Sequence, residues 1–419
     1  MKVWTWVAGA LALAAVSGVA VFGVVAQQEL SRIEHDPPFV LESAGFPLEP
    51  AEPTPIDGSA LHATLTQLAE NPGLGEFHAR VSDATTGEVV FDRLAGEALQ
   101  PASVTKVLTA AAAILQLGAE DTVTTEVVRG VNPDRVVIKA AGDVWLDAEA
   151  LDELAAQVGQ AQEVFIDTSA WAGMPEMING WDPVDIDGGY VAPLQPAMLS
   201  GGRLDGATSG DVPRSHTPAL DVAQALADRV GAIVVGETDA PPEAEVVASV
   251  ESPTLVERLD VMMKQSDNVY AEAIGREVAL SRGTQDAPAA TLTILGEHGF
   301  DAAGVTLADN SGLSTLNRIP PQLIDAILAN AAAEPTLRPL LSTLPVAAGE
   351  GTLVDRYEDL PGRGWVRAKT GTLDGTAALA GTVTSVNGNV YTFALICNDA
   401  DVLEARRGMD EFTSALRQF

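Results

Sequence analysis

The sequence predicts an α/β (α+β) fold in which helices flank an antiparallel sheet, and a second domain is inserted between two parts of this sheet domain. Two hairpin patterns indicate the antiparallel sheet: FHARVSDATTGEVVF turns at Thr86-Gly87, and two apolar strands meet at Asn387-Gly388. The chain of 419 residues exceeds one ordinary core of ~100–200 residues. Residues 120–250 carry their own series of helix and strand patterns, which indicates the inserted domain.

The N-terminus predicts export. Val3 to Ala26 is an uncharged, mostly apolar stretch after Lys2, and its length suits a membrane helix of ~20 residues. Val24-Val25-Ala26 is also an acceptable cleavage site, so residues 1–26 are a membrane anchor or a signal sequence, with the uncleaved anchor favoured. Lys2 on the inner side places the rest of the chain outside the cytoplasm. Residues 27–58 hold scattered prolines and acids and are expected to form a linker.

The first part of the sheet domain, 59–119, begins with the helix pattern SALHATLTQLAE, followed by the first hairpin. The segment PASVTKVLTAAAAILQLG then predicts a buried helix, with Pro101 in its first turn and Gly118 as its C-cap. Within the insertion we expect strands at TVTTEVVRG, DRVVIKAAGD, EVFIDTSAW and AIVVGE, and helices at LDAEALDELAAQVG and ALDVAQALADRVG. Residues 170–213 have no clear period.

The second part of the sheet domain, 251–419, opens with a helix for which Ser252 and Pro253 provide an expected N-cap and first turn. This helix breaks at QSDN before NVYAEAIGREVAL continues helically, and a polar triplet at such a break can point into a cleft. The strand candidates GWVRAKTGTL, TAALAGTVTSV and NVYTFALICN follow, and a closing amphipathic helix can cover the sheet.

Charge and composition exclude several classes of function. A net charge of -34 repels nucleic acid phosphates and anionic lipid surfaces, so no nucleic acid partner is expected. The single cysteine, Cys397, lies in an apolar run and predicts a buried structural thiol. The five histidines are scattered without a metal-binding or Ser-His-Asp motif, so we expect no metal and no organic cofactor.

Ser103 and Lys106 are the first candidates for catalysis. They lie three residues apart at the start of a helix, so their side chains share one face, and lysine is rare in this chain, with only five residues. Burial and the positive potential of the helix N-terminus disfavour the ammonium form, so Lys106 can accept the Ser103 hydroxyl proton. An exposed helical pair without a role is the alternative for this motif alone.

Two further motifs strengthen the case for a catalytic role of Ser103 and Lys106. They are Ser266-Asp267-Asn268 in the helix break and Lys369-Thr370-Gly371 on a strand. Ser266 can relay a proton between Lys106 and a leaving amine, and Asn268 can bind Lys106 and a substrate amide. Lys369, Thr370 and Thr372 can bind a substrate carboxylate, and Gly371 would let the substrate backbone approach. The backbone amides of Ser103 and Thr372 form the expected oxyanion pair.

In this order, the three motifs resemble those of serine penicillin-binding proteins and class A β-lactamases. The likeness is closest to the low-molecular-mass class C D-alanyl-D-alanine carboxypeptidases and endopeptidases, the DacB-like serine peptidases, which carry a large insertion between the first and second motifs. It continues through the segments FIDTSAWAG, GWDP, YVAPLQPAML, ADNSGLSTLNRIPPQ and LPVAAGEGTLVDRY, and spans about residues 59–419. The resemblance implies a transpeptidase-like catalytic domain formed by 59–119 and 251–419, with the insertion at 120–250.

The resemblance also implies a substrate and leaves alternatives open. Ser103 would attack the peptide bond before a terminal D-alanine of a peptidoglycan stem peptide, the same site could cut cross-links, and β-lactams would acylate it. Asp143 matches an acidic residue of a family turn that here departs from the usual glycine-rich pattern; it is a candidate for binding a stem-peptide amine, with turn capping as the alternative. The turn Asn310-Ser311-Gly312 is expected to shape the cleft wall. A β-lactamase and a catalytically idle cell-wall binding protein remain the rival functions.

Overall fold

The computed structural model describes residues 3–4, 6–7, 22, 24–25, 27–28 and 58–419. Most of the predicted anchor and linker therefore lies outside the described residues. Within the described part, no helix combines the length and the apolar character needed to cross a membrane. The chain divides into two units, Met1–Ala51 and Glu52–Phe419, and the second unit holds everything that follows.

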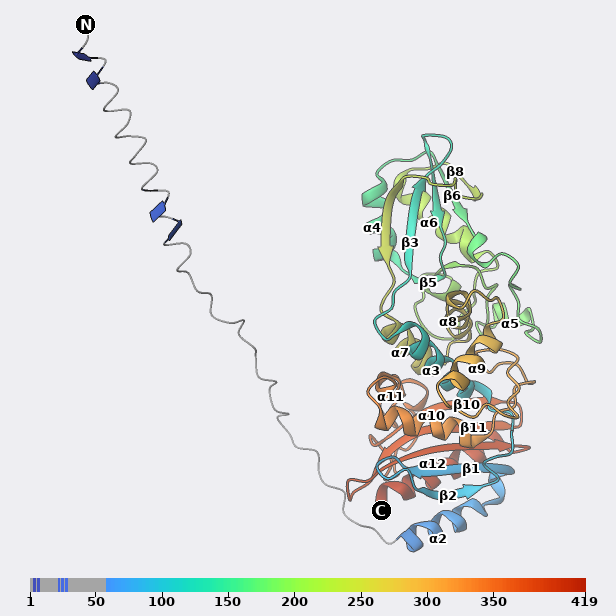
Figure 1. Cartoon of the computed structure of the whole chain (residues 1–419). Helices are drawn as coiled ribbons and strands as arrows, with labels where there is room; N and C mark the ends of the chain where they lie inside the picture. Colours follow the sequence, from blue (N-terminus) through green and yellow to red (C-terminus); the bar gives the residue numbers. More distant parts are fainter. Residues whose placement is uncertain (1–2, 5, 8–21, 23, 26, 29–57) are drawn as a thin grey trace. The chain divides into compact units, whose positions relative to one another are not determined.

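An antiparallel five-stranded sheet brings together the two ends of this unit, as predicted, and its strand order is β10-β11-β12-β1-β2. Its strands, coloured blue and red in Figure 1, are β1 (Glu76–Asp83), β2 (Val89–Arg93), β10 (Val366–Leu373), β11 (Thr376–Thr384) and β12 (Val390–Asn398). Strand β1 pairs with β12, so the first hairpin completes a sheet whose other three strands come from the C-terminal part.

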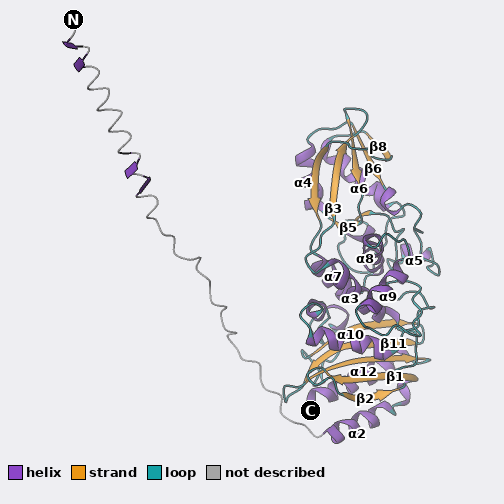
Figure 2. Ribbon diagram, in the orientation of Figure 1, coloured by secondary structure: helices purple, strands orange, loops and turns teal. Residues whose placement is uncertain are grey.

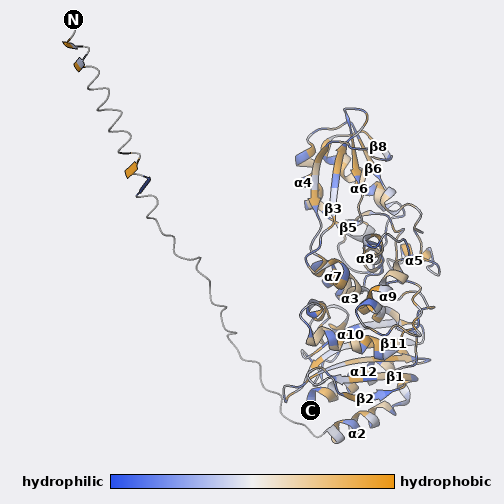
Figure 3. Ribbon diagram, in the orientation of Figure 1, coloured by the Kyte–Doolittle hydropathy of each residue, from blue (hydrophilic) through white to orange (hydrophobic). Residues whose placement is uncertain are grey.

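Both faces of this sheet are buried, each in its own hydrophobic core. Alternate residues of each strand point to opposite sides and so enter different cores. Leu379 of β11 packs with the helices α2 (Gly58–Ala69) and α12 (Val402–Gln418), whereas its neighbours Ala378 and Ala380 belong to a second core that contains α10 (Pro321–Ala333). The small side chains on that second face let the helices approach the sheet closely. In Figure 3, hydrophobic residues, drawn in orange, lie both on the strands of this sheet and on the helices around it.

A layer of helices lies over the alanine-lined face (Figure 2). At its centre is α3 (Lys106–Leu117), which follows the short 3-10 turn η2 (Ala102–Thr105) and is buried from Lys106 to Ile114. Around it are α7 (Leu255–Gln265), α8 (Asn268–Ser281), α9 (Ala287–Glu297) and α11 (Arg338–Ser342). The alanine-rich sequence of α3 therefore reflects a helix with neighbours on nearly every side.

A second five-stranded sheet is formed within residues 124–251, with order β8-β6-β4-β3-β9. Its strands are β3 (Thr124–Arg129), β4 (Arg135–Lys139), β6 (Glu163–Asp167), β8 (Val234–Glu237) and β9 (Val246–Glu251). The β4–β6 and β6–β8 pairs are parallel, and α4 (Ala148–Val158) and α6 (Pro218–Val230) share a core with this sheet. The short elements β5 (Asp143–Leu146), α5 (Val184–Asp187) and β7 (Ala197–Leu199) also belong to the insertion. The assignment of 120–250 as a separate domain stays a prediction.

One local prediction is wrong. Helix α7 begins at Leu255, and its N-cap is Thr254, which forms a capping box with Glu257. Ser252 instead accepts a hydrogen bond from the backbone N–H of Val123 and donates one to Pro253 O. It therefore connects the segment just before the second sheet to the segment just after it. Serine before proline resembles a cap, but threonine with glutamate three residues later satisfies two backbone donors reciprocally.

Candidate active site

Ser103 and Lys106 meet at the start of the central helix. Ser103 lies in the 3-10 turn η2, and Lys106 is the first residue of α3. Their side chains are joined by a hydrogen bond of 3.1 Å between Lys106 Nζ and Ser103 Oγ. Ser103 is half-buried and borders the cleft, whereas Lys106 is fully buried behind it. The serine is thus accessible to a ligand while the amine is shielded from water.

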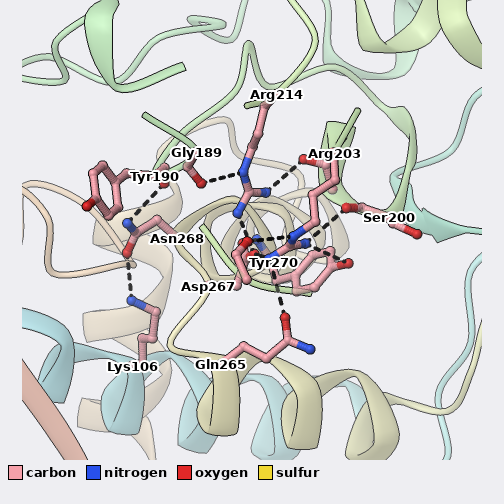
Figure 4. Close-up of polar contacts among 12 residues, drawn as sticks. Lys106, Gly189, Tyr190, Ser200, Arg203, Arg214, Gln265, Asp267, Asn268 and Tyr270 are labelled. Atoms are coloured by element: carbon pink, nitrogen blue, oxygen red, sulfur yellow. Dashed lines mark hydrogen bonds and ion pairs between the residues drawn. The ribbon is translucent and has the colours of Figure 1, made fainter. Parts of the chain in front are cut away.

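The other two partners of Lys106 are oxygen atoms without a proton. Lys106 Nζ donates to Asn268 Oδ1 at 2.8 Å and to the backbone oxygen of Ser311 at 2.7 Å. Asn268 is held in the orientation that presents its oxygen, because its Nδ2 donates to Tyr190 O at 3.1 Å (Figure 4). A neutral amine has two N–H groups and one lone pair. With both N–H groups directed at these oxygens, the lone pair is left for the Ser103 hydroxyl.

The surroundings of Lys106 bring its titration toward neutral pH. Burial lowers the pKa of Lys106 to about 8, although Asp309, Asp267 and Glu272 each act to raise it. Desolvation is the larger effect, because the ammonium loses its hydration without a carboxylate in direct contact. The neutral form is therefore a substantial population just above pH 7.

The second motif lies between α7 and α8, as predicted, and its three side chains go to three different partners. Ser266 adopts a left-handed conformation with φ of 59° and accepts a hydrogen bond of 2.8 Å from Lys369 Nζ. Asn268 contacts Lys106, and Asp267 accepts from Tyr270 N at the start of α8. Ser266 is therefore bound to the lysine of the third motif, not to Lys106.

Asp267 is the centre of a buried charge cluster that the sequence did not reveal. Its Oδ2 accepts hydrogen bonds from Arg203 at 2.6 Å and from Arg214 at 2.7 Å, both from the insertion (Figure 4). We call these three residues the arginine clamp. Burial alone would raise the pKa of the Asp267 carboxyl, but Arg214 and Arg203 outweigh it and lower the pKa to about 2. The clamp fixes the insertion against the loop that presents Ser266 and Asn268.

The third motif lies on β10, the outer strand of the first sheet. Lys369 is buried, donates to Ser266 Oγ and to Thr370 O, and has a pKa held well below its usual value by burial and by Lys106. Thr370 binds Thr352, while Thr372 is exposed and accepts a hydrogen bond of 2.7 Å from Arg406. The two threonines thus lie along one edge of the cleft, which both of them line.

The backbone of β10 directs some of its N–H groups to the outer edge of the sheet, beside the cleft. Ala368 donates its N–H to Pro345 O across the outer edge of the sheet. Because N–H groups alternate between the two edges of a strand, the N–H groups of Thr370 and Thr372 point to the same side. Gly371 packs against the turn that carries Ser103. A Cβ there would lie 2.6 Å from Pro101 O, so the glycine makes room for this turn, and its expected role toward a substrate backbone stays a prediction.

The turn at residues 309–312 supports Lys106 from the side opposite Ser103. Glu272 Oε1 accepts from the backbone N–H groups of Asn310 and Ser311, at 2.9 and 2.8 Å, and so orients the Ser311 carbonyl toward Lys106. Burial and Asp309 raise the pKa of Glu272 to about 8. Gly312 has φ of 81°, and a Cβ there would lie 2.0 Å from Ala102 O. The turn therefore packs directly against the segment that carries Ser103.

Asp143 lies apart from this group of side chains, and its assignment as a substrate-binding residue stays a prediction. Its side chain is buried outside the cleft lining, and its carboxylate accepts a hydrogen bond from Trp145 N. Burial raises the pKa of the Asp143 carboxyl to about 6. It therefore caps a turn within the insertion, which was the alternative interpretation of this residue.

An open cleft of about 1900 Å³ joins the pieces, lined by Ser103, Ser266, Asn268, Thr370 and Thr372 among others. Residues from two parts of the chain form its walls, among them Tyr190 of the insertion and Thr352 in the segment before β10. In the part of the chain that the structure describes, no cluster of three His, Cys, Asp or Glu side chains could hold a metal ion. Cys397 is buried in β12, and burial raises the pKa of its thiol to about 12.

Comparison with known proteins agrees with this geometry. The chain is 40% identical to the carboxypeptidase DacB of Mycolicibacterium smegmatis over 97% of this chain and 95% of that protein. It is 28% identical to a D-alanyl-D-alanine carboxypeptidase of an Actinomadura species, over 83% of this chain and 84% of the relative. Among solved structures, penicillin-binding protein 4 (dacB) of Haemophilus influenzae has a TM-score of 0.70 at 22% identity and covers 85% of this chain and 99% of its own.

The sequence also matches, over residues 61–211 and 205–416, the D-Ala-D-Ala carboxypeptidase 3 (S13) family. These two matched stretches together contain all three motifs and the arginine clamp. With the Ser103–Lys106 pair, the Lys369–Ser266 pair and the shared fold in place, the chain belongs to this family of serine peptidases.

Proposed function

We propose that the protein is a serine-type D-alanyl-D-alanine carboxypeptidase that acts on peptidoglycan stem peptides and also cuts D-amino-acid cross-links. The observation that carries the proposal is the environment of Lys106 Nζ. Two acceptor-only oxygens, of Asn268 and Ser311, take its two N–H groups, and its third neighbour is Ser103 Oγ. This arrangement makes Lys106 a general base for one hydroxyl.

The reaction proceeds in two transfers of the acyl group. Ser103 Oγ attacks the carbonyl carbon of the penultimate D-alanine while its proton moves to Lys106. The C–N bond then breaks, and the departing D-alanine amine takes up a proton. In the second transfer, water attacks the Ser103 ester, the C–O bond breaks, and Ser103 regains its proton. The group that protonates the leaving amine is either Lys106 or Ser266, which is hydrogen-bonded to Lys369.

Negative charge on the attacked carbonyl oxygen is stabilised by two backbone donors, those of Ser103 and Thr372. Ser103 lies in the first turn of η2, where backbone N–H groups have no partner within the helix. The Thr372 N–H points to the outer edge of β10, on the side of the cleft. Removal of one such donor costs about 3 kcal/mol of transition-state stabilisation in other acyl-transfer enzymes.

The location follows from the substrate and the N-terminus together. Peptidoglycan is built outside the cytoplasmic membrane, so we place the enzyme there, held by residues 1–26 if they remain uncleaved. Support for cross-link cutting comes from the fold that the chain shares with a structure of Bdellovibrio bacteriovorus described as a predatory peptidoglycan endopeptidase, at a TM-score of 0.56 and 18% identity. β-Lactams resemble the D-alanyl-D-alanine terminus and are expected to acylate Ser103.

The test is incubation of the full chain with a fluorescent penicillin, followed over time by intact mass, with Ser103→Ala as the matched variant. A long-lived adduct in the wild type that is absent from the variant supports the proposal. Rapid turnover of the penicillin would identify a β-lactamase instead. A folded protein with neither adduct nor turnover would point to an idle cell-wall binding protein.

A second arm separates the two peptidase activities. A linear pentapeptide and a cross-linked peptide dimer are digested in parallel, and the products are separated by chromatography. Release of D-alanine from the pentapeptide establishes the carboxypeptidase, and conversion of the dimer to monomers establishes the endopeptidase. Ser103→Ala should lose both, because one nucleophile serves both reactions, and full retention of either would refute its assignment.

A further inference from the structure

The cleft is lined by six cationic side chains outside the two motif lysines, and five of them already have a carboxylate partner. Arg203 and Arg214 bind Asp267, Lys264 binds Asp260 and Glu350, Arg356 binds Asp410, and Arg407 binds Glu404. The sixth is Arg406. Among the described residues, no carboxylate oxygen lies within 4.0 Å of a guanidinium nitrogen of Arg406, so Arg406 forms no ion pair there.

Arg406 is held next to the third motif. It lies in α12, is half-buried, and its Nη2 donates a hydrogen bond of 2.7 Å to Thr372 Oγ1. The acid one turn further along its helix is Asp410, which acts electrostatically on Arg406, but both oxygens of Asp410 accept hydrogen bonds from Arg356. Arg406 therefore has no carboxylate in direct contact within the described part of the chain, and it lies at the end of β10 where Thr372 borders the cleft.

The hydrogen bond to Thr372 also sets the direction in which that residue can donate. A hydroxyl carries one proton, and Thr372 Oγ1 already accepts from Arg406. Its own proton is thus free for an acceptor in the cleft. An anion placed there would receive one hydrogen bond from the hydroxyl and would lie beside the guanidinium.

Lys369, the obvious cation for such an anion, is poorly suited to act alone. It is completely buried and already donates to Ser266 and to Thr370 O. Burial and the neighbouring Lys106 lower the pKa of Lys369 well below its usual value, so both disfavour its ammonium form. A guanidinium keeps its proton at every pH in the working range of the enzyme.

We propose that Arg406 binds the α-carboxylate of the residue that leaves the substrate, together with Thr372, and makes the enzyme select a free carboxylate over a carboxamide. The inference rests on the proposed function, because it deepens the description of the same substrate. It also answers an electrostatic problem of this protein. A net charge of -34 disfavours the approach of an anionic peptide terminus, and a guanidinium beside the cleft without a carboxylate in contact offsets part of this repulsion.

The test compares two peptides that differ only at the C-terminus, diacetyl-L-lysyl-D-alanyl-D-alanine and its C-terminal carboxamide. The full chain is assayed as wild type, Arg406→Ala, Arg406→Gln and Arg407→Ala, and kcat/KM is measured from the released amino acid or amino-acid amide. Arg407→Ala is the matched control, because it removes the same charge from the next residue, whose guanidinium is paired with Glu404.

We expect Arg406→Ala to lower kcat/KM for the free acid by about 10- to 100-fold, the range for a lost hydrogen bond to a charged group. The carboxamide should change by less than about threefold, so the preference for the acid should collapse. Arg406→Gln keeps a donor of similar reach without the charge and should behave like Arg406→Ala. Arg407→Ala should retain the wild-type preference.

A structural role for Arg406 predicts a different pattern, in which both peptides lose activity equally and their ratio stays at the wild-type value. That ratio overturns the inference even if activity falls. Arg406→Gln gives the same readout if Arg406→Ala fails to fold, as judged by thermal unfolding. Wild-type protein that neither releases D-alanine nor forms a penicillin adduct would overturn the proposed function, and with it the inference. An active wild type with an unchanged ratio in the variants overturns the inference alone.

Discussion

Removal of the Asp267 carboxylate should destabilise the whole unit and also disable the active site. The proposed change is Asp267→Asn, which keeps the size of the side chain and its ability to cap α8 at Tyr270 N. What it removes is the negative charge between Arg203 and Arg214. All three side chains are at most 2% exposed, so water cannot compensate for the missing charge.

The loss of unfolding free energy in Asp267→Asn can be estimated in two ways. The difference between an ordinary aspartate pKa of 3.8 and the value of about 2 corresponds to roughly 2 kcal/mol of stabilisation of the charged form. Removing one partner from a buried ion pair costs about 3–5 kcal/mol, because the other charge is left without compensation. We expect a loss of about 3–5 kcal/mol, because two buried arginines are left unpaired. The value from the pKa is smaller because it describes only the difference between the charged and the protonated carboxyl.

The assay is urea unfolding followed by tryptophan fluorescence, together with the rate of acylation by a fluorescent penicillin. Asp260→Asn is the control, because Asp260 pairs with Lys264 one turn before the same loop but is 39% exposed. Such a surface pair contributes below about 1 kcal/mol. Acylation should fall strongly in Asp267→Asn, since Asn268 follows directly and orients Lys106. A loss of less than about 1 kcal/mol in Asp267→Asn, equal to that of the control, would refute the argument.

The same carboxylate predicts a pH dependence of stability. Its pKa is lower in the folded protein than in the unfolded chain, so the stabilisation is complete above about pH 4 and is lost as the pH falls through about 2. The free energy of unfolding of the wild type should therefore fall more steeply between pH 4 and 2 than that of Asp267→Asn. Parallel curves would show that the two arginines do not discriminate between the charged and neutral forms.

Two further predictions concern Lys106 and its supporting turn. Because Lys106 must be neutral to act as a base and its pKa is about 8, kcat/KM should rise with pH through this value, and Asp309→Asn should move the rise to lower pH, because the Asp309 charge raises the pKa of Lys106. An unshifted profile of kcat/KM against pH would contradict the coupling. Gly312→Ala should abolish penicillin acylation, since a Cβ would lie 2.0 Å from Ala102 O, whereas Gly304→Ala has a similar φ and open space and should stay active. Equal activity in the two alanine variants would argue against close packing at Gly312.

The first sheet and the central helix could be predicted because their signals are local. Period-two apolar patterns and glycine-containing turns mark the strands, and Pro101 and Gly118 bracket the nucleophile segment. Ser103 and Lys106 are three residues apart, so helical geometry alone brings them together. The pairing of β1 with β12 joins residues more than 300 positions apart, and no local pattern specifies it.

The contacts of Gly371 and Asp143 could not be predicted from the sequence, for a common physical reason. In both cases the direction of the side chain, or the space left by a missing one, depends on a neighbour that the motif does not specify. Pro101 occupies the space beside Gly371, and Trp145 N takes the Asp143 carboxylate. The spacing of residues within one segment cannot predict tertiary contacts of this kind.

The missed arginine clamp shows why the insertion cannot be treated as an addition to a finished catalytic domain. Tyr190 and Arg203 lie in residues 170–213, the stretch without a periodic pattern, and Arg214 directly follows it. Backbone turns and charges, not strands or helices, position these residues. Tyr190 O fixes the orientation of Asn268, and that orientation directs an N–H of Lys106 away from Ser103. Without the insertion, the Asp267 charge would be buried without a partner and the Asn268 amide would be free to rotate. The insertion therefore helps to set the basicity of Lys106, and excising residues 120–250 should remove catalysis as well as any substrate contacts that the insertion makes.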